Sequence, residues 1–226
     1  MINLTAENID KYSKNCVLFD IETTGLSSET DAVIELSALK VIDGSVRDEF
    51  STLIDPGCNI PYDSTMIHGI TDDMVRGAPD MRAALKGFKD FAEDMVLAGH
   101  NIKRFDLKFI QRDALNFLGR ELRNEYIDTL AVARRLLPQL ESRSLGSLAE
   151  YYGISYAGAH RALADCHINF EVFKSLALEA KNPSKEALLV KVCPLCGNIL
   201  KQRNGKFGEF FGCTNFPDCR YTEDIK

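Results

Sequence analysis

Apolar and polar residues alternate in three stretches near the start of the chain, and this pattern predicts three consecutive strands. The first stretch is residues 16–22, Cys-Val-Leu-Phe-Asp-Ile-Glu, a buried strand that ends in polar residues. Two longer stretches, 33–42 and 46–54, flank the dipeptide Asp43-Gly44. Asp-Gly between apolar stretches is typical of a tight hairpin turn. The domain is therefore expected to open with a β-meander.

Further along the chain, apolar residues recur at helical spacing in three segments, 81–95, 107–118 and 163–177. The short apolar segment 96–99 predicts another strand. Ser144 is placed to cap a helix that runs to Tyr152, and Gly153 is placed to end it. A meander followed by helices that alternate with short strands indicates an α/β fold.

Two domains are expected, because the last long helix is interrupted by Asn182-Pro-Ser184 and a cysteine-rich tail follows. We place one domain at residues 1–182, a linker at 183–191 and a small domain at 192–226. The tail is too short to bury a core of its own without a cross-link or a metal.

Composition supports a folded chain with a sizeable core and argues against a membrane protein. The 226 residues are 45% hydrophobic, and no apolar run exceeds about five residues, whereas a spanning helix needs about 20. The first fifteen residues lack the apolar segment of a signal peptide, so a cytoplasmic location is expected.

Charge is distributed unevenly along the chain. The net charge is −6, but the residues from Lys191 onward carry six Lys/Arg and four Asp/Glu, a net of +2. The rest therefore carries −8. A basic tail on an acidic body is what a polyanion-binding appendix on a metal-dependent enzyme would look like.

The candidate chemistry begins with Asp20 and Glu22 at the end of the first predicted strand. Residues two apart on a strand point to the same side, so these carboxylates would lie close together. Their repulsion would be relieved by a hard cation such as Mg²⁺ or Mn²⁺. The alternative is two solvated acids at the exit of a strand.

Three more residues could join this pair. Asp106 follows the predicted strand 96–99 and precedes a helix, where it could also be an ordinary N-cap. Asp165 lies in an early helical turn and could be an ordinary surface acid. His160 follows Ala157-Gly158-Ala159, and a histidine on such a loop could swing over a site that Asp165 helps to build.

Three motifs in this order resemble those of the DEDDh 3′→5′ exonucleases, the family of proofreading exonucleases, ribonuclease T and oligoribonuclease. The first is Phe19-Asp-Ile-Glu-Thr-Thr-Gly25, the second spans residues 101–106, and the third is His160 followed by Asp165. The resemblance covers about residues 14–180. It implies a ribonuclease H-like fold, with a mixed five-stranded sheet flanked by helices.

The resemblance also implies residue roles. Asp20, Glu22, Asp106 and Asp165 would hold two Mg²⁺ or Mn²⁺ ions, and His160 would be the general base. A site for the 3′-terminal nucleotide would be formed by Thr23, Thr24, Gly25, Leu26, Ile67, His68, Asn101 and Phe105. Asp128 would support the site, while Lys103 and Arg104 could reach phosphate or remain solvated.

Four cysteines in the tail have the spacing of a zinc site: Cys193, Cys196, Cys213 and Cys219. Two close pairs of thiolates can complete a tetrahedral Zn²⁺ site, and the metal would supply folding energy that so few residues lack. Four unrelated thiols are the alternative.

The segment 205–222 resembles the zinc ribbons at the C-terminus of bacterial type IA topoisomerases, and this resemblance implies binding of single-stranded DNA. Aromatic and cationic residues interleave there, which suits base stacking and phosphate contacts. They are Phe207, Phe210, Phe211, Phe216, Tyr221, Lys201, Arg203, Lys206 and Arg220. Some of the aromatics could instead pack against the zinc knuckles.

Taken together, the sequence predicts a metal-dependent 3′→5′ exonuclease that hydrolyses single-stranded DNA to 5′-mononucleotides and holds the strand with a zinc ribbon. An RNA exonuclease of the same mechanism is the first alternative. A nucleic-acid-binding adaptor with an inactive nuclease fold is the second. A proofreading subunit bound to a polymerase or repair complex is the third. The oligomeric state is left open.

Overall fold

The computed structural model describes residues 2–156, 158, 160–206 and 208–225. In the first domain, two antiparallel pairings and two parallel pairings build a mixed five-stranded sheet with the order β3-β2-β1-β4-β5. Its strands are β1 (Cys16–Thr23), β2 (Val33–Ile42), β3 (Ser45–Leu53), β4 (Leu97–Gly99) and β5 (Tyr126–Asp128). The expected α/β fold, with its mixed five-stranded sheet, is confirmed.

The predicted hairpin is present between β2 and β3. Asp43 and Gly44 have positive φ values of 51° and 72°, as a two-residue turn that matches the strand twist requires. A glycine tolerates such values without steric cost, and an aspartate tolerates them better than most residues.

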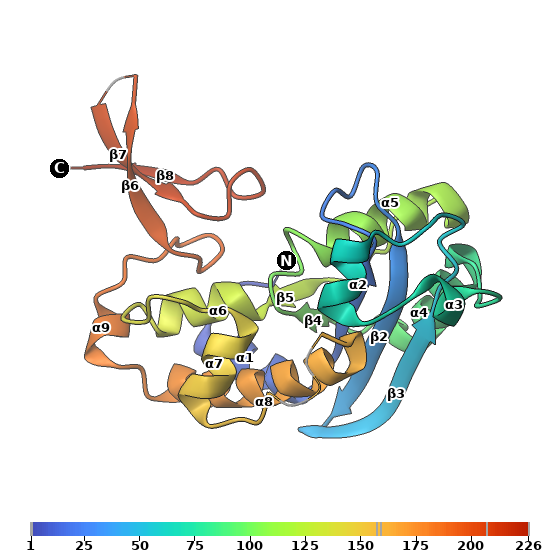
Figure 1. Cartoon of the computed structure of the whole chain (residues 1–226). Helices are drawn as coiled ribbons and strands as arrows, with labels where there is room; N and C mark the ends of the chain where they lie inside the picture. The colour runs from blue at the N-terminus through green and yellow to red at the C-terminus, as the bar shows by residue number, and fades with distance from the viewer. Residues whose placement is uncertain (1, 157, 159, 207, 226) are drawn as a thin grey trace.

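Helices cover both faces of the sheet (Figure 1). Those of the first domain are α1 (Ala6–Lys14), α2 (Tyr62–His68), α3 (Asp72–Val75), α4 (Met81–Ala92), α5 (Asp106–Leu118), α6 (Thr129–Leu136), α7 (Leu145–Tyr152) and α8 (Ala162–Lys181). Alternate residues of β1 point to opposite faces, so Cys16 and Leu18 join a core with α8, whereas Val17 and Phe19 join a core with α4 and α5.

The cysteine-rich tail forms a small three-stranded antiparallel sheet, which stands to one side of the larger sheet (Figure 1). Its strands are β6 (Leu200–Gly205), β7 (Gly208–Cys213) and β8 (Thr222–Asp224). The segment expected to be a linker contains a single helical turn, α9 (Lys185–Leu188). Among the helices that the structure describes, none is both long and apolar enough to cross a bilayer.

Candidate active site and zinc-binding cluster

The carboxylates of Asp20 and Glu22 lie on the face of β1 that α8 covers, because they share the strand parity of Leu18. Asp165 stands in the first turn of α8. One carboxylate oxygen from each of these three residues lies within 4.8 Å of the other two. Strand alternation and the docking of one helix therefore bring together acids that are more than 140 residues apart.

Asp106 reaches the same cluster from the neighbouring strand. It is the first residue of α5, which follows β4, and β4 runs parallel to β1. Its side chain is 3% exposed, and its charge contributes to raising the pKa of Asp20. Phe105, not Asp106, occupies the N-cap position, so Asp106 is not the ordinary cap that the sequence allowed.

Ionising all four carboxylates of this acidic cluster is unfavourable in the absence of a cation, because they are at least partly buried and lie close to one another. Burial, followed by the neighbouring acids, raises the pKa of Asp20 and raises that of Glu22 to about 8. Burial also raises the pKa of Asp106 to about 7. Oδ1 of Asp106 and Oδ1 of Asp165 are buried without a hydrogen-bond partner among the described residues. Hard oxygen donors in this state fit a divalent cation such as Mg²⁺ or Mn²⁺.

These raised pKa values predict a pH-dependent stability of the metal-free protein. In the folded state Glu22 and Asp106 keep their protons up to about pH 8 and about pH 7, whereas the unfolded chain releases them near pH 4. Raising the pH between these values therefore favours the unfolded chain and lowers the free energy of unfolding. We expect the melting temperature in magnesium-free buffer to fall by several degrees between about pH 5 and about pH 8. Saturating Mg²⁺ should remove most of this fall.

Thermal melts with and without Mg²⁺ across this range would measure the effect, with zinc kept constant to preserve the cysteine cluster. A melting temperature that does not respond to pH or Mg²⁺ would show that the carboxylates ionise normally and hold no cation.

His160 lies directly beside the acidic cluster, on the loop before α8. Its backbone N–H donates to Oδ2 of Asp165 at 3.3 Å, and its φ of 67° turns the chain sharply there. The imidazole meets the ring of Tyr156 edge-on, with 6.2 Å between centroids. Ala157 and Ala159 of the loop expected here are outside the described residues.

Tyr156 and an ion pair between a buried glutamate and an exposed arginine are features of the site that the sequence motifs did not reveal. Burial, then Asp165 and Asp20, raise the pKa of Tyr156, which places its phenol near the cluster. Glu35 on β2 is 2% exposed and pairs with Arg161 through bonds of 2.6 and 3.1 Å. The same carboxylate accepts the backbone N–H of Ala162 at 3.1 Å. This pairing anchors the start of α8, and with it His160 and Asp165.

The turn after β1 is stabilised by its threonines. The hydroxyl of Thr23 donates to the carbonyl of Gly25 at 2.6 Å, and the hydroxyl of Thr24 accepts the N–H of Ala32 at 2.9 Å. A Cβ on Gly25 would lie 2.5 Å from Oδ2 of Asp31, so a larger residue would displace this carboxylate from the N–H of Ser27. Leu26, in contrast, is 87% exposed and is free to contact a ligand.

The other residues expected to line the substrate site fall into two groups. Ile67 on α2 is 62% exposed, whereas His68 is buried and its Nδ1 accepts the N–H of Ile70 at 3.0 Å. The backbone N–H of Asn101 donates to Oδ1 of Asp128 at 3.0 Å. Asp128 thus holds the loop that leads to Asp106, as its expected supporting role requires.

Phe105 sits at the end of this loop and is partly buried. Its ring packs against Phe109 with 5.1 Å between centroids, so the residue before Asp106 is anchored in the core.

The four cysteines of the tail converge as their spacing predicts. Cys193 and Cys219 have their Sγ atoms 3.6 Å apart, and Cys196 and Cys213 have theirs 3.5 Å apart. A disulfide needs about 2.05 Å. Four thiolates at about 2.3 Å from a tetrahedral Zn²⁺ are about 3.8 Å from one another, which these separations approach.

Further hydrogen bonds support the thiolates of this cluster. The amide of Asn198 reaches Sγ of Cys196 at 3.6 Å, and the N–H of Asn215 reaches Sγ of Cys213 at 3.4 Å. The pKa of Cys196 is lowered, because hydrogen bonds from the Asn198 backbone and the neighbouring thiols outweigh the opposing effect of burial, whereas burial raises the pKa of Cys213 and of Cys219. The four sulfur atoms nevertheless converge with the separations of a tetrahedral site. The donor set therefore fits Zn²⁺.

Comparison with known proteins identifies the family to which the first domain belongs. The family described as Exonuclease matches residues 17–173. The chain belongs to the exonuclease family. The expected resemblance to the DEDDh 3′→5′ exonucleases is confirmed for this domain. Residues 190–226 match a second family, described as Topoisomerase DNA binding C4 zinc finger, which confirms the expected ribbon.

Several relatives share the exonuclease domain. The DNA polymerase III subunit epsilon of Aquifex aeolicus is 37% identical over 157 residues, which cover 70% of this chain and 77% of that protein. The DNA polymerase III PolC-type protein of Clostridium perfringens is 40% identical over 165 residues. These cover 73% of this chain but only 11% of that protein, so the chain spans about a tenth of its PolC-type relatives.

Solved structures share the fold. Exonuclease X in complex with 5′ overhanging duplex DNA aligns with a TM-score of 0.59 at 24% identity, covering 76% of this chain and 96% of that one. Escherichia coli exonuclease I in complex with a dA16 oligonucleotide aligns with a TM-score of 0.66 at 17% identity, covering 90% and 52%.

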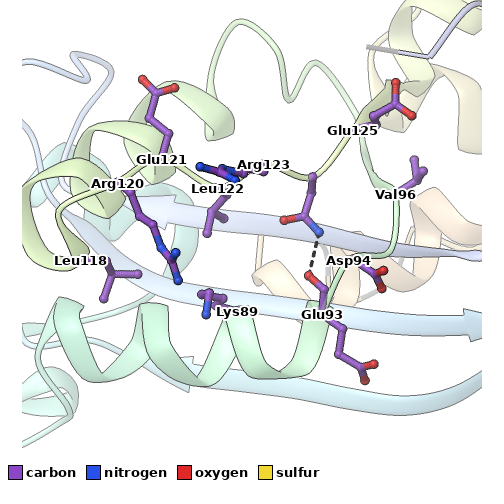
Figure 2. Close-up of a pocket in the computed structure, with 11 residues that line it drawn as sticks. Lys89, Glu93, Asp94, Val96, Leu118, Arg120, Glu121, Leu122, Arg123 and Glu125 are labelled. Carbon is purple, nitrogen blue, oxygen red and sulfur yellow. Dashed lines mark hydrogen bonds between the residues drawn. The ribbon is translucent and has the colours of Figure 1, made fainter.

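A separate hollow of about 320 Å³ lies at the opposite end of the exonuclease sheet (Figure 2). Its lining includes Val96 and Glu125, the residues before β4 and β5, whereas the acids follow the other ends of the strands. The side-chain amide of Asn124, which also lines the hollow, donates to the carbonyl of Glu93 at 3.1 Å. No member of the acidic cluster lines this hollow, so it is not the catalytic site.

Proposed function

We propose that the chain removes nucleotides from the 3′ end of single-stranded DNA and releases 5′-mononucleotides. The observation that carries this proposal is the meeting of Asp20, Glu22 and Asp165 beside His160. Asp106 is close enough for its charge to raise the pKa of Asp20. The relatives named as polymerase III proteins, the neighbour bound to dA16 and the DNA-binding ribbon family favour DNA over RNA.

In this proposal the four acids hold two Mg²⁺ or Mn²⁺ ions. Such ions, when bound, lower the pKa of a water and neutralise charge on the attacking and leaving oxygens. His160 accepts the proton of the attacking water as general base, since an imidazole exchanges protons near neutral pH. The ion pair of Glu35 with Arg161 keeps this loop next to Asp165.

The terminal nucleotide is placed against the exposed apolar side chains of Leu26 and Ile67, which flank the turn after β1 and the end of α2. Ser64 joins these two segments, because its hydroxyl donates to the carbonyl of Thr24 at 2.8 Å. Bases can pack on such side chains without sequence preference, as a general exonuclease requires.

The proposed domain organisation is an exonuclease domain at residues 1–182, a linker at 183–191 and a zinc ribbon at 192–226. In the ribbon, Cys193, Cys196, Cys213 and Cys219 would hold one structural Zn²⁺ ion. The exposed ring of Phe216, 60% accessible, would stack on a base of the single strand.

Matched single strands of DNA and RNA, each with a 5′ label, test this proposal. We expect faster shortening of DNA, and we expect Phe216→Ala to raise KM about tenfold on a long DNA strand but not on a dinucleotide, because stacking is worth about 1–3 kcal/mol per base. Phe117→Ala, which alters a partly exposed ring on α5, is the matched control. Preference for RNA would contradict the assignment of DNA as the substrate. Equal KM values for Phe216→Ala and wild type would contradict the proposed stacking by the ribbon.

A proofreading role beside a DNA polymerase is the second candidate, and the names of the polymerase III relatives favour it. Removal of a mispaired 3′ nucleotide faster than a paired one would support this role.

A further inference from the structure

A cationic groove of about 520 Å³ lies between the ribbon and the exonuclease domain. Both domains supply positive charge to it. Arg104 precedes Asp106 in the second motif, and Arg134 and Arg143 come from α6 and the loop before α7. Lys201 and Arg203 come from β6 of the ribbon. Among the described residues that line this groove, none is acidic.

The charge in this groove is not neutralised within the part of the chain that the structure describes. None of the five cations forms an ion pair there. The guanidinium of Arg143 does donate to the backbone carbonyls of Leu137 and Pro138, which holds its positive charge at the wall of the groove. Burial, then the nearby charge of Arg104, lowers the pKa of Arg134, and Asp128 opposes this shift. Unpaired cations gathered on a chain whose net charge is −6 indicate a site for an anion.

The groove connects two other hollows through shared residues. Arg203 also lines a hollow of about 260 Å³ on the ribbon, where Phe210 and Phe216 lie. Arg134 and Arg143 also line a hollow of about 590 Å³ that reaches Asn101 and contains one acid, Glu141. Asn101 begins the loop that ends at Asp106. The ribbon aromatics, the cations and Asn101, which lies at the start of the loop leading to Asp106, therefore line adjoining hollows.

Direct contacts hold the two walls of the groove together. Nζ of Lys103 pairs with Asp218 at 2.9 Å and donates to the carbonyl of Asn215 at 3.1 Å. The N–H of Leu4 donates to the carbonyl of Cys196 at 3.4 Å. Lys103 is the neighbour of Arg104, so the ribbon is fixed beside the loop that carries the groove's first arginine.

We propose that this groove binds the phosphodiester backbone of single-stranded DNA between the ribbon and the catalytic carboxylates. Bases stack in the aromatic hollow of the ribbon, phosphates cross the groove on its arginines, and the 3′ end enters the acidic cluster. This inference rests on the proposed function, and it assigns the path of the strand upstream of the scissile bond.

Binding of labelled DNA by a full-length variant that cannot cleave it tests this path. In an Asp20→Ala background, Arg134→Gln with Arg203→Gln should weaken binding of a strand of about 20 nucleotides by about tenfold. The slope of log K against log salt should fall in magnitude by about 1.4, since each phosphate contact to a single strand contributes about 0.7. Both residues keep much of their surface accessible to solvent, and their side chains form no hydrogen bond within the described residues, so folding should be retained.

Two comparison variants define the outcome. Arg47→Gln with Arg82→Gln removes two exposed charges that do not line the groove, and it should leave the slope unchanged. Arg134→Lys with Arg203→Lys keeps the charge and should retain most of the slope. An unchanged slope in the Gln variant, or the same loss in the control, overturns the proposal.

Activity on a dinucleotide, which is too short to cross the groove, separates the proposal that the groove binds DNA from the proposal that the chain is an exonuclease. An otherwise wild-type chain with both Gln substitutions should hydrolyse it at the wild-type rate. A large loss on the dinucleotide would place these arginines in catalysis and contradict the path. Absence of hydrolysis by the wild type would refute the proposed function without changing the binding result.

Discussion

Replacement of Asp106 by Asn is expected to reduce hydrolysis by about 10³-fold or more while making the metal-free protein more stable. The substitution removes a carboxylate that the proposed metal site requires, so transition-state charge is no longer neutralised. It also removes a charge that burial disfavours, as the raised pKa of about 7 indicates. At about pH 8 we expect a gain on the order of 2 kcal/mol, or about 4–8 °C in melting temperature.

Asp90→Asn is the matched control, because Asp90 is exposed on α4 and lies outside the cluster. Its activity and melting temperature should match those of the wild type. If Asp106→Asn were less stable than the wild type in metal-free buffer, the carboxylate of Asp106 would be stabilised by contacts within the protein. Its burial would then be no sign of a cation site. An Asp106→Asn variant that keeps full activity would remove Asp106 from the catalytic site.

Replacement of His160 by Ala is expected to lower kcat by about 10²- to 10⁴-fold, the usual contribution of a general base. Metal binding should be retained, because Asp165 is bound by the backbone N–H of His160 and not by its imidazole. The rate on a short DNA strand and the stabilisation by Mn²⁺ in a thermal melt measure these two properties separately.

His167→Ala is the control for removal of an imidazole, since His167 lies on α8 and pairs with Glu49 at 3.1 Å at the surface. It should leave the rate unchanged. A His160→Ala variant that turns over at the wild-type rate would exclude this residue as the base. Loss of the Mn²⁺ effect would instead make it a structural part of the acidic cluster.

Local signals allowed much of the fold to be predicted. The Asp43-Gly44 turn is present as expected, and Ser144 caps α7, where its hydroxyl accepts the N–H of Ser147 at 3.1 Å. Helix α1 was not predicted, because Ala6–Lys14 is largely polar. It is held by tertiary contacts, which include the burial of Ile9 against α8 and the pairing of Lys181 with Asp10.

Part of the candidate site could likewise be predicted from local sequence motifs, and part depends on the tertiary structure. The acids and His160 stand in motifs of short, recognisable spacing, so their convergence was expected from the sequence. The pairing of Glu35 with Arg161 joins residues 126 positions apart, and no local pattern marks it. The groove depends on how the ribbon docks through Lys103 and Asp218, which only the tertiary structure reveals.

The most direct test of the central claim is a time course on single-stranded DNA with a 5′ label, for wild type and Asp20→Ala, with and without added Mg²⁺. The account predicts a ladder of labelled products that shorten from the 3′ end, formed only by the wild type and only with Mg²⁺. Equal ladders from both proteins, or no shortening by the wild type with either Mg²⁺ or Mn²⁺, would contradict it.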